Sequence, residues 1–444
     1  MPIVNGRRSN VVASLIAGLS MIGSAAVARA QERDPEQQAA RVTPIVQVVR
    51  KVGPTVVNLY ADLEIQGGFF GTQDAGSLGS GVIVHPSGLI VTNAHVITGN
   101  SRSARIKDVT VSYRPDWTSS RDDMKKFKAR VLGFDRTNDL ALLQIQAPGP
   151  FPSAKLGTSS DLMIGETVVA VGNPLGREGS VTHGIVSATN RSLSSPTGDQ
   201  FDDLIQTDAP LNSGNSGGPL YNILGELIGI NQAIAGDRQF GRAEGQGLAL
   251  PVDRVRDLLG TEFNPADLLH VWLGLDLENG EGRGAVVRRI DRDGPGARAG
   301  IQTGDTVVKV GGYDVTDRTA FNLSVCSLDP GEAIPLVVLR DGRKREVSLQ
   351  PVSIDTAVRQ RLGGKLVLDS GYLVFADVDA RGAAEKIGVR ESDALVEIAG
   401  ERVSSIQDVF DVLRKIKAGD EAKVVLYRFS RGRVSRTLEG EIKL

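Results

Sequence analysis

The sequence predicts a mainly β protein with a small domain duplicated at its C-terminal end. From Val56 to Pro251, short runs of Val, Ile and Leu alternate with clusters of Gly, Asn, Asp and Pro, which is the pattern of strands joined by tight turns. The segment contains no helix-length pattern, so a barrel or a sandwich is favoured over a βαβ fold. After this segment, one arrangement of residues occurs twice.

Length and composition limit the class of protein. At 444 residues the chain is too long for one core, so about two to four domains are expected. The 51 basic and 53 acidic residues nearly balance, which gives no reason to expect nucleic acid or a charged membrane as partner. The single cysteine, Cys326, excludes an intrachain disulfide and is expected to be a small buried hydrophobe. No cluster of His, Asp or Glu has metal-ligand spacing, so neither a metal nor a cofactor is expected.

The N-terminus has the features of a secretory signal peptide. Arg7 and Arg8 precede a mostly apolar run over residues 11–27, and Ala28-Arg29-Ala30 fits the small-x-small rule for cleavage. Serines and glycines dilute the run, whereas a membrane span needs about 20 strongly apolar residues. We therefore expect residues 1–30 to be removed after export, with a membrane anchor as the alternative if they are kept. The arginine pair also fits a twin-arginine signal, which leaves the export route open.

The elements before the duplication can be given in order. Residues 31–41 are polar and expected to form a flexible leader, and a short helix is expected from Pro44 to its end at Gly53. A second helix is expected over residues 252–259. Strands are expected over Gly81–Val84, Leu89–Thr92, Val109–Tyr113, Asp139–Ile145, Thr167–Val171, Ser180–Ala188 and Glu226–Asn231.

In the duplicated C-terminal part, matching residues stand 88 positions apart, as Ile290 and Val378 do. Its units are about 85 residues long, which is the size of a small independent domain. Further matches are Gly300 with Gly388, Asp305 with Asp393, Gly312 with Gly400, Gly331 with Gly419, and Arg340 with Arg428.

A glycine-rich turn carries the candidate nucleophile, Ser216. In Gly214-Asn215-Ser216-Gly217-Gly218 the glycines permit a tight turn that aims backbone N–H groups at a developing oxyanion. A serine hydroxyl also needs a base within hydrogen-bond reach. The turn alone is weak evidence, because such turns occur in many β proteins.

The base can be sought among only four histidines: His85, His95, His183 and His270. His95 lies at the end of a predicted strand beside small residues and is the candidate. His85 in a turn and His183 in a strand are expected to be structural. Asp139 begins an apolar strand, where a buried carboxylate would orient an imidazole and stabilise its charged form.

A second fold also satisfies the Gly-x-Ser-x-Gly spacing. The nucleophile elbow of α/β-hydrolases needs a strand–turn–helix context, with the acid and the histidine after the serine. Here only His270 follows Ser216, and βαβ units are absent from the pattern. The order His, Asp, Ser is that of chymotrypsin-like enzymes instead, so we reject the elbow interpretation.

Taken together, these segments resemble the HtrA (Deg) family of serine proteases over essentially the whole chain after the signal. The resemblance implies a trypsin-like double six-stranded β-barrel followed by two small α+β PDZ domains. The segments that carry it are Ser80–Ile83, Thr92–His95, Asn138–Ala141, Gly172–Pro174, Thr182–Ser187, Gln206–Asp208 and Gly214–Leu220. The expected boundaries are 1–30 for the signal, 31–261 for the protease domain, 265–352 for the first PDZ domain and 358–444 for the second.

The resemblance also implies roles for single residues. His95 would be the general base and acid, Asp139 its orienting carboxylate and Ser216 the nucleophile. The backbone N–H groups of Gly214 and Ser216 would form the oxyanion hole. The primary specificity pocket would be lined by Leu211, Ile230 and Ile234, and with no acidic residue among them, cleavage after small or medium aliphatic residues is expected.

Regulation is expected to lie outside the N-terminus. Asn215 is neutral and cannot pair with a freshly cleaved N-terminus as the aspartate of zymogen-type relatives does, so control would come from loops, partners or oligomerisation. In the family, a loop after the Ile-Val-Ser strand senses ligands. Here it would be Thr189–Gln200, with Arg191 as the sensing arginine and a solvated loop charge as the alternative role.

A PDZ domain adds an extended peptide to its sheet edge and holds the terminal carboxylate in a nest of backbone N–H groups. In the first module the nest is expected at Leu273-Gly274-Leu275, where the glycine permits the N–H groups to converge. The second module has a less well-formed loop near residues 362–365, and Ser392 replaces the glycine found at Gly304. It is expected to be structural or to bind weakly.

The resulting prediction is a periplasmic serine endopeptidase that degrades misfolded or damaged proteins through an acyl-enzyme, in protein quality control and the stress response. Its expected partners are unfolded polypeptides and C-terminal peptides, without nucleic acid and without strong membrane association after signal cleavage. Protomers are expected to form homotrimers or multiples of them. The alternative is a protease-like chaperone or PDZ scaffold with little proteolysis, which the complete triad disfavours.

Overall fold

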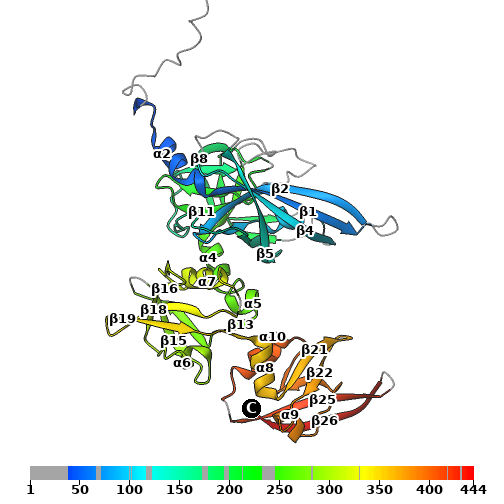
Figure 1. Cartoon of the computed structure of the whole chain (residues 1–444). Coiled ribbons are helices and arrows are strands. Elements are labelled where there is room, and N and C mark those ends of the chain that lie inside the picture. Colours follow the sequence, from blue (N-terminus) through cyan, green and yellow to red (C-terminus); the bar gives the residue numbers. More distant parts are fainter. Residues whose placement is uncertain are drawn as a thin grey trace, which may run out of the picture. The chain divides into compact units, whose positions relative to one another are not determined.

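The computed structural model describes residues 39–66, 72–99, 101, 103–116, 123–172, 179–194, 200–212, 214–232, 246–281, 284–329, 331–417, 419–430 and 433–444. Within these residues the chain forms two closed six-stranded antiparallel barrels and, further along the sequence, two smaller sheets (Figure 1). The mainly β fold class is confirmed. The predicted signal peptide, residues 1–30, lies outside the described residues.

The first barrel has the strand order β1-β2-β3-β6-β5-β4. Helix α2 (Pro44–Val52) and the short 3-10 helix η1 (Gly53–Thr55) precede it, and α2 ends before Gly53 as predicted. Its strands are β1 (Val56–Gln66), β2 (Thr72–His85), β3 (Leu89–Thr92), β4 (Ala104–Tyr113), β5 (Lys125–Asp135) and β6 (Leu140–Ile145).

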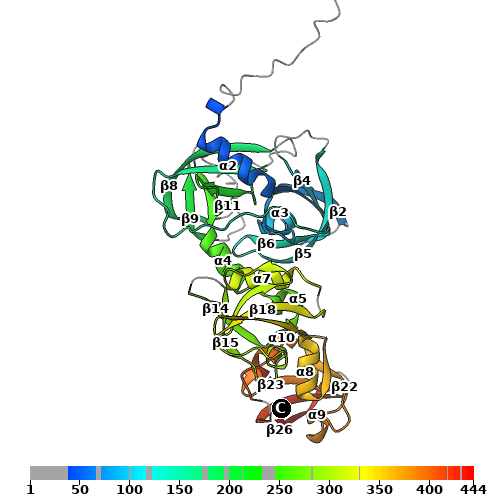
Figure 2. The same cartoon turned by 60° about the vertical axis from the view of Figure 1, so that its left-hand side comes forward.

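Helix α3 (Ala94–Thr98) closes this barrel on the side where the site lies. It packs against β1, β2, β4 and β6, and Figure 2 shows it within the ring of strands. Its apolar side chains Val96 and Ile97 belong to the barrel core together with Leu59, Ile83 and Leu143. The burial of these side chains holds the helix in place, because five residues are too few for a helix that is stable alone.

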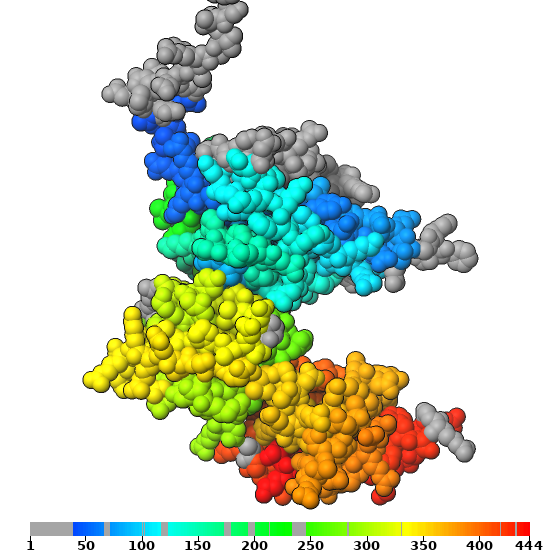
Figure 3. Space-filling model, in the orientation of Figure 1, coloured from blue at the N-terminus to red at the C-terminus, as the bar shows by residue number. Residues whose placement is uncertain are grey.

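Strands β1 and β2 form a long hairpin that projects from the barrel (Figure 3). The pairing continues as far as Gln66 and Thr72, so most of the insertion between Tyr60 and Ser77 is strand. Two apolar side chains on this hairpin, Tyr60 and Leu78, are paired with each other and are 42% and 54% exposed.

The second barrel has the order β10-β11-β12-β9-β8-β7. Helix α4 (Val252–Gly260) follows it, in agreement with the predicted closing helix. The strands are β7 (Thr167–Gly172), β8 (Ser180–Ser194), β9 (Gln200–Thr207), β10 (Pro219–Asn222), β11 (Leu227–Gln232) and β12 (Gly247–Pro251).

The two C-terminal sheets have the same strand order, which is the structural counterpart of the sequence duplication. The first contains β14 (Leu275–Asn279), β15 (Ala285–Ile290), β16 (Thr306–Val310), β17 (Tyr313–Asp314), β18 (Ile334–Arg340) and β19 (Arg343–Leu349), with helices α5 (Pro265–Leu269), α6 (Pro295–Arg298) and α7 (Arg318–Cys326). The second contains β21 (Gly364–Asp369), β22 (Tyr372–Val378), β23 (Ala394–Ile398), β24 (Glu401–Arg402), β25 (Glu421–Ser430) and β26 (Arg433–Lys443), with helices α8 (Ile354–Leu362), α9 (Ala383–Lys386) and α10 (Ile406–Leu413).

An ion pair repeats with the same offset in the two modules. Arg340 Nε donates to Asp305 Oδ1 at 2.7 Å, and Arg428 Nε donates to Asp393 Oδ1 at 2.7 Å. Both aspartate side chains are almost fully buried. Burial opposes ionisation of Asp305, but hydrogen bonds from Arg340 and from the Gln302 backbone outweigh it and hold the carboxyl pKa below its usual value. The duplicated sequence therefore repeats a buried charged pair as well as a chain path.

The chain from Val48 to Leu444 forms one compact unit. Strand β13 (Val271–Trp272) of the first module pairs with β20 (Val352–Ser353), which leads into the second. The single cysteine, Cys326, is fully buried on α7 as predicted, and burial raises the pKa of its thiol to about 12. Among the described residues, no helix combines the length and the apolar character needed to cross a membrane.

Candidate active site and peptide pocket

The carboxylate of Asp139 holds His95 through both of its oxygens. His95 Nδ1 lies 2.7 Å from Oδ2, and the His95 backbone N–H donates to Oδ1 at 2.9 Å. Because an ionised carboxylate only accepts, Nδ1 carries the proton of the neutral imidazole and Nε2 is left as the basic atom. The histidine is the second residue of α3 and follows the end of strand β3 by three residues, whereas it was predicted at the strand end.

Asp139 is itself fixed by its backbone. It has a left-handed conformation with φ of 51°, and Asn93 Nδ2 donates to its carbonyl oxygen at 2.9 Å. Asn93 is fully buried at the residue before α3, so it connects the segment that carries the base with the segment that carries the acid. Asn93 lies within the segment Thr92–His95 that resembles the family, but its amide contact with a residue 46 positions away leaves no local signal in the sequence.

The turn that carries Ser216 packs directly against the His95 segment. A Cβ at Gly217 would lie 2.1 Å from Thr92 Oγ1 and 3.0 Å from Asn93 N, so only glycine fits there. Gly217 N–H donates to Asn231 O at 2.9 Å, which ties the turn to β11 of the second barrel. The turn is therefore held at the place where elements of both barrels meet.

Ser80 on β2 fixes the same turn from the first barrel. Its N–H donates to Ser216 O at 2.9 Å, and its Oγ donates to Gly214 O at 2.6 Å. Gly214 has φ of 106°, which only glycine adopts without strain. This role of Ser80 could not be predicted, because its hydrogen bond to Gly214 joins residues 134 positions apart and leaves no local pattern in the sequence.

Asn215 fills a closed space beside the candidate nucleophile. It is 1% exposed, and a Cβ at Gly172 would lie 2.5 Å from its Oδ1. A neutral amide is thus buried where zymogen-type relatives place an ion-paired aspartate.

The predicted specificity-pocket residues have three different outcomes. Leu211 is half-buried and packs against the core of the second barrel, close to Gly247. Ile230 on β11 has no exposed surface, and its role in the specificity pocket stays a prediction. Ile234 falls outside the described residues.

Arg191 is not in a loop, in contrast to the prediction for Thr189–Gln200. It lies in strand β8 opposite Leu204 of β9, and its Nε donates to Gln206 Oε1 at 2.9 Å. The strand continues to Ser194, and Gln200 begins the next strand. The physical reason is a hairpin with repeated bulges, which lets polar residues pair although they do not alternate.

In the loop predicted to be the carboxylate nest of the first PDZ module, two backbone carbonyls accept hydrogen bonds from within the module. Leu273 O accepts from Gly296 N–H at 2.8 Å, and Gly274 O accepts from Asp291 N–H at 3.1 Å. In a planar trans peptide the N–H points away from the carbonyl, so the N–H groups of Gly274 and Leu275 face the opposite side. Gly274 has φ of 69°, and a Cβ there would lie 2.9 Å from Gly294 Cα.

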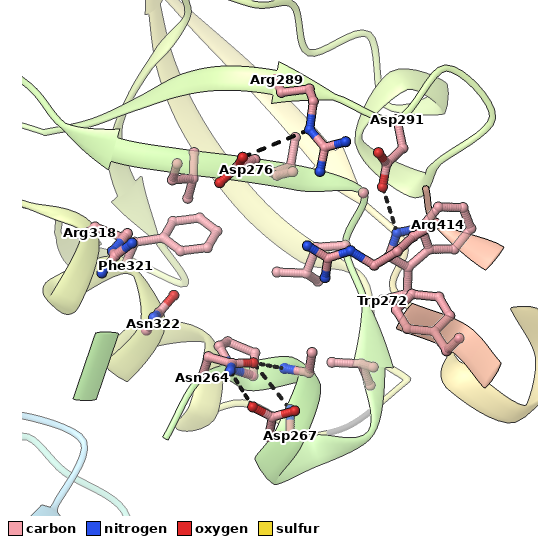
Figure 4. A pocket seen from close by; sticks show the side chains of 18 of the residues that line it. Asn264, Asp267, Trp272, Asp276, Arg289, Asp291, Arg318, Phe321, Asn322 and Arg414 are labelled. Atoms are coloured by element: carbon pink, nitrogen blue, oxygen red, sulfur yellow. Dashed lines mark hydrogen bonds and ion pairs between the residues drawn. The ribbon is translucent and has the colours of Figure 1, made fainter. Parts of the chain in front are cut away.

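A pocket of about 330 Å³ lies on this side, between the edge strand β14 and helix α7 (Figure 4). Leu273, Leu275 and Phe321 give it apolar surface. Two of its acids have partners: Asp276 lies 3.8 Å from Arg289, and Asp291 accepts from Trp272 Nε1 at 3.0 Å. The pocket combines an unpaired strand edge with backbone donors, which are the two elements of strand addition.

The corresponding loop of the second module differs in one bond. Gly363 O accepts from Asp379 N–H at 2.9 Å, as Gly274 O does from Asp291. However, Gly363 N–H donates to Arg359 O at 2.7 Å, because α8 runs directly into the loop. One N–H of the equivalent nest is therefore used to cap a helix.

The two barrels and the paired His95 and Asp139 define a trypsin-like serine protease, which is followed along the chain by a PDZ domain. Residues 79–230 match the model of the trypsin-like peptidase domain, and residues 259–350 match that of the PDZ domain. A probable periplasmic serine endoprotease, DegP-like, of Halomonas elongata is 33% identical over 389 residues, which cover 80% of this chain and 78% of the relative. Its namesake in Pseudomonas fluorescens is 32% identical, with coverage of 78% and 75%.

The chain belongs to this family of HtrA-type, DegP-like serine endoproteases, as the resemblance implied. Similar solved structures include the HtrA-type protease AlgW with a decapeptide, at 30% identity, with 70% of this chain and 98% of that chain covered and a TM-score of 0.40. A serine endoprotease from Yersinia pestis is also 30% identical, with coverage of 69% and 96% and a TM-score of 0.36.

Proposed function

We propose that this serine endopeptidase uses Ser216 as nucleophile, His95 as general base and acid, and Asp139 as the orienting carboxylate. The observation that carries the assignment is the two-point contact between His95 and Asp139, at 2.7 and 2.9 Å, beside the turn of Ser216. The side chain of Asp139 is 11% exposed and that of His95 is 36% exposed. The acid is therefore shielded while the base is accessible to substrate.

The reaction follows from these positions. Ser216 Oγ attacks the carbonyl carbon of the scissile amide while its proton passes to His95 Nε2. The oxyanion is stabilised by the N–H groups of Gly214 and Ser216, a contribution of about 3 kcal/mol for each donor in such sites. The C–N bond then breaks as the imidazolium protonates the leaving amine. Water then attacks the acyl-enzyme while His95 Nε2 takes its proton, and the imidazolium returns a proton to Ser216 Oγ as the acid product leaves.

The proposed substrates are peptide bonds after small or medium aliphatic residues. Leu211 supports this preference, because an apolar side chain beside the serine turn offers no partner to Lys or Arg. Peptide substrates that differ only at this residue, with Val, Ala, Phe or Lys, test it by their kcat/KM values. A preference for Lys would contradict the assignment.

We further propose a periplasmic, homo-oligomeric enzyme of protein quality control that acts on misfolded polypeptides. The relatives are named periplasmic, and the exposed pair Tyr60 and Leu78 on the β1–β2 hairpin offers apolar surface to another protomer. The first PDZ module would bind C-terminal peptides at Leu273, Gly274 and Leu275. Light scattering with crosslinking measures the oligomer, for which a trimer is expected.

The decisive experiment is casein digestion by wild type, Ser216→Ala and the matched control Ser160→Ala, an exposed serine away from the site. Wild type and Ser160→Ala should cleave equally, and Ser216→Ala should leave casein intact. If wild type cleaves no better than Ser216→Ala, the nucleophile assignment fails. Suppression of aggregation without cleavage would instead support the chaperone alternative.

A further inference from the structure

One face of helix α10 in the second PDZ module lines the peptide pocket of the first. Gln407, Phe410, Asp411 and Arg414 all border the pocket, and their spacing places them on one side of the helix. The opposite side of α10 is buried in the core of the second module through Val409, Val412 and Leu413. The helix therefore belongs to the core of one module and to the pocket wall of the other.

The contact next to the nest is well packed. The Phe410 ring meets the Trp272 ring edge to face, with centroids 5.8 Å apart and an interplanar angle of 71°. Trp272 directly precedes the nest, and it packs with Ala266 against the core of the second module. The chain between the modules adds a further tie, because Ile354 N–H donates to His270 O at 2.9 Å.

Arg414 has the charge that the nest itself lacks. It follows the last residue of α10, its side chain is 44% exposed, and its guanidinium is directed into the pocket beside Trp272 (Figure 4). Asp411 lies 3.7 Å from it, which is longer than a hydrogen bond, and Asp267, a second acid of the pocket, also attracts it electrostatically. Of the other two arginines that line the pocket, Arg318 and Arg289, the latter lies against Asp276. At 3.7 Å, Asp411 takes no hydrogen bond from Arg414, which leaves guanidinium donors for a ligand.

We propose that Arg414 of the second PDZ module binds the terminal carboxylate of a peptide held in the pocket of the first module, so that the two modules form one composite site. The proposal rests on the proposed peptide binding by the first module. The occupant is the free C-terminus of a polypeptide with an apolar last residue. Backbone N–H groups at Gly274 and Leu275 and a guanidinium across the pocket are the donors that a carboxylate accepts from.

The test uses the full chain with Ser216→Ala, which prevents cleavage of the probe. Fluorescence anisotropy measures binding of a labelled nonapeptide ending in Val-Val-Leu, with either a free carboxylate or a terminal amide. Arg414→Gln removes the charge, Arg414→Lys keeps it, and Arg436→Gln changes an exposed arginine of β26 as the matched control.

We expect Arg414→Gln to weaken binding of the free acid about five- to tenfold and to leave the amide unchanged. Arg414→Lys should recover most of the affinity, and Arg436→Gln should equal the parent chain. Equal losses for acid and amide would show a merely structural arginine and overturn the proposal. An unchanged affinity of Arg414→Gln for the free acid would also overturn the proposal, but peptide binding by the first module would still stand. If the parent chain binds neither peptide, the proposed function of the first module fails and this inference fails with it.

Discussion

The imidazole of His85 is buried, with 5% of its surface exposed, and it is a source of acid sensitivity. Nδ1 lies 2.7 Å from Ser87 Oγ, and Nε2 lies 3.1 Å from Ser324 Oγ. Burial lowers the pKa of His85 from 6.5 to about 4. Between these two values the unfolded chain binds a proton that the folded chain does not bind. Burial of the neutral His85 therefore does not lower the free energy of unfolding above pH 6.5, and it lowers this free energy progressively as the pH falls toward 4.

The magnitude follows from 1.36 kcal/mol for each pKa unit. The whole window corresponds to about 3 kcal/mol, and about 2 kcal/mol is lost by pH 5. Urea unfolding followed by circular dichroism, in the Ser216→Ala background at pH 8 and pH 5, measures it. His85→Gln keeps a polar side chain that can hydrogen-bond but does not titrate, and His183→Gln changes an exposed histidine as control.

The parent chain and His183→Gln should each lose about 2 kcal/mol more than His85→Gln on acidification. His85→Gln will be less stable at pH 8, but the comparison uses the difference between the two pH values, which that offset does not affect. If His85→Gln loses as much stability as the parent chain, burial of the neutral imidazole is not the cause and the reasoning is refuted.

Three further predictions concern the triad, the repeated ion pair and the nest. Asp139→Asn should lower kcat about ten-thousand-fold near neutral pH with little change in KM, because an amide does not hold the Nδ1–H tautomer of His95. Peptide hydrolysis measures this effect, and a loss of kcat below about tenfold would contradict the prediction. Arg340→Gln leaves Asp305, 1% exposed, without its guanidinium partner and should lower stability by about 3 kcal/mol in thermal unfolding, whereas the exposed Lys344→Gln should not. Gly274→Ala should weaken peptide binding at least about tenfold, since its Cβ would meet Gly294. Gly300→Ala, with φ of 78° but open space around it, is the control for backbone strain alone, and equal effects of the two variants on binding would refute a specific role of the nest.

Local hydrophobic pattern was enough to predict most strands of the barrels. The predicted run Leu89–Thr92 is strand β3 without change, and the helix expected over 252–259 is α4. Strand β3 is predictable because all its side chains are buried and turn residues bound it. Helix α4 is predictable because its buried side chains, Val252, Val255, Leu258 and Leu259, recur with the period of a helix. The sequence also singled out His95 and Asp139, since four histidines leave few candidates, and these two residues are in contact in the structure.

Contacts that span long sequence distances were not predictable in the same way. The segment around Arg191 is polar and resembles a loop, yet it pairs with β9 through register shifts between Val186 and Leu193. Ile230 has the right residue type for a pocket wall, but it lies in β11, whose residues are buried on both faces of the strand. In both cases the neighbouring strand decides the outcome, and a single sequence contains no record of that neighbour.

The duplicated modules show most clearly how similar sequences acquire different roles. Gly274 and Gly363 accept the same backbone hydrogen bond, from Asp291 and Asp379 respectively. The difference lies in what precedes each glycine: a short strand leaves the first N–H directed at the pocket, and helix α8 uses the second as its cap. The second module thereby loses a donor of its own nest, while the outer face of its helix α10 borders the nest of the first. If the first module binds peptides as proposed, the duplication supplies one nest with two free N–H groups and one wall for it, and the second loop needs no nest of its own.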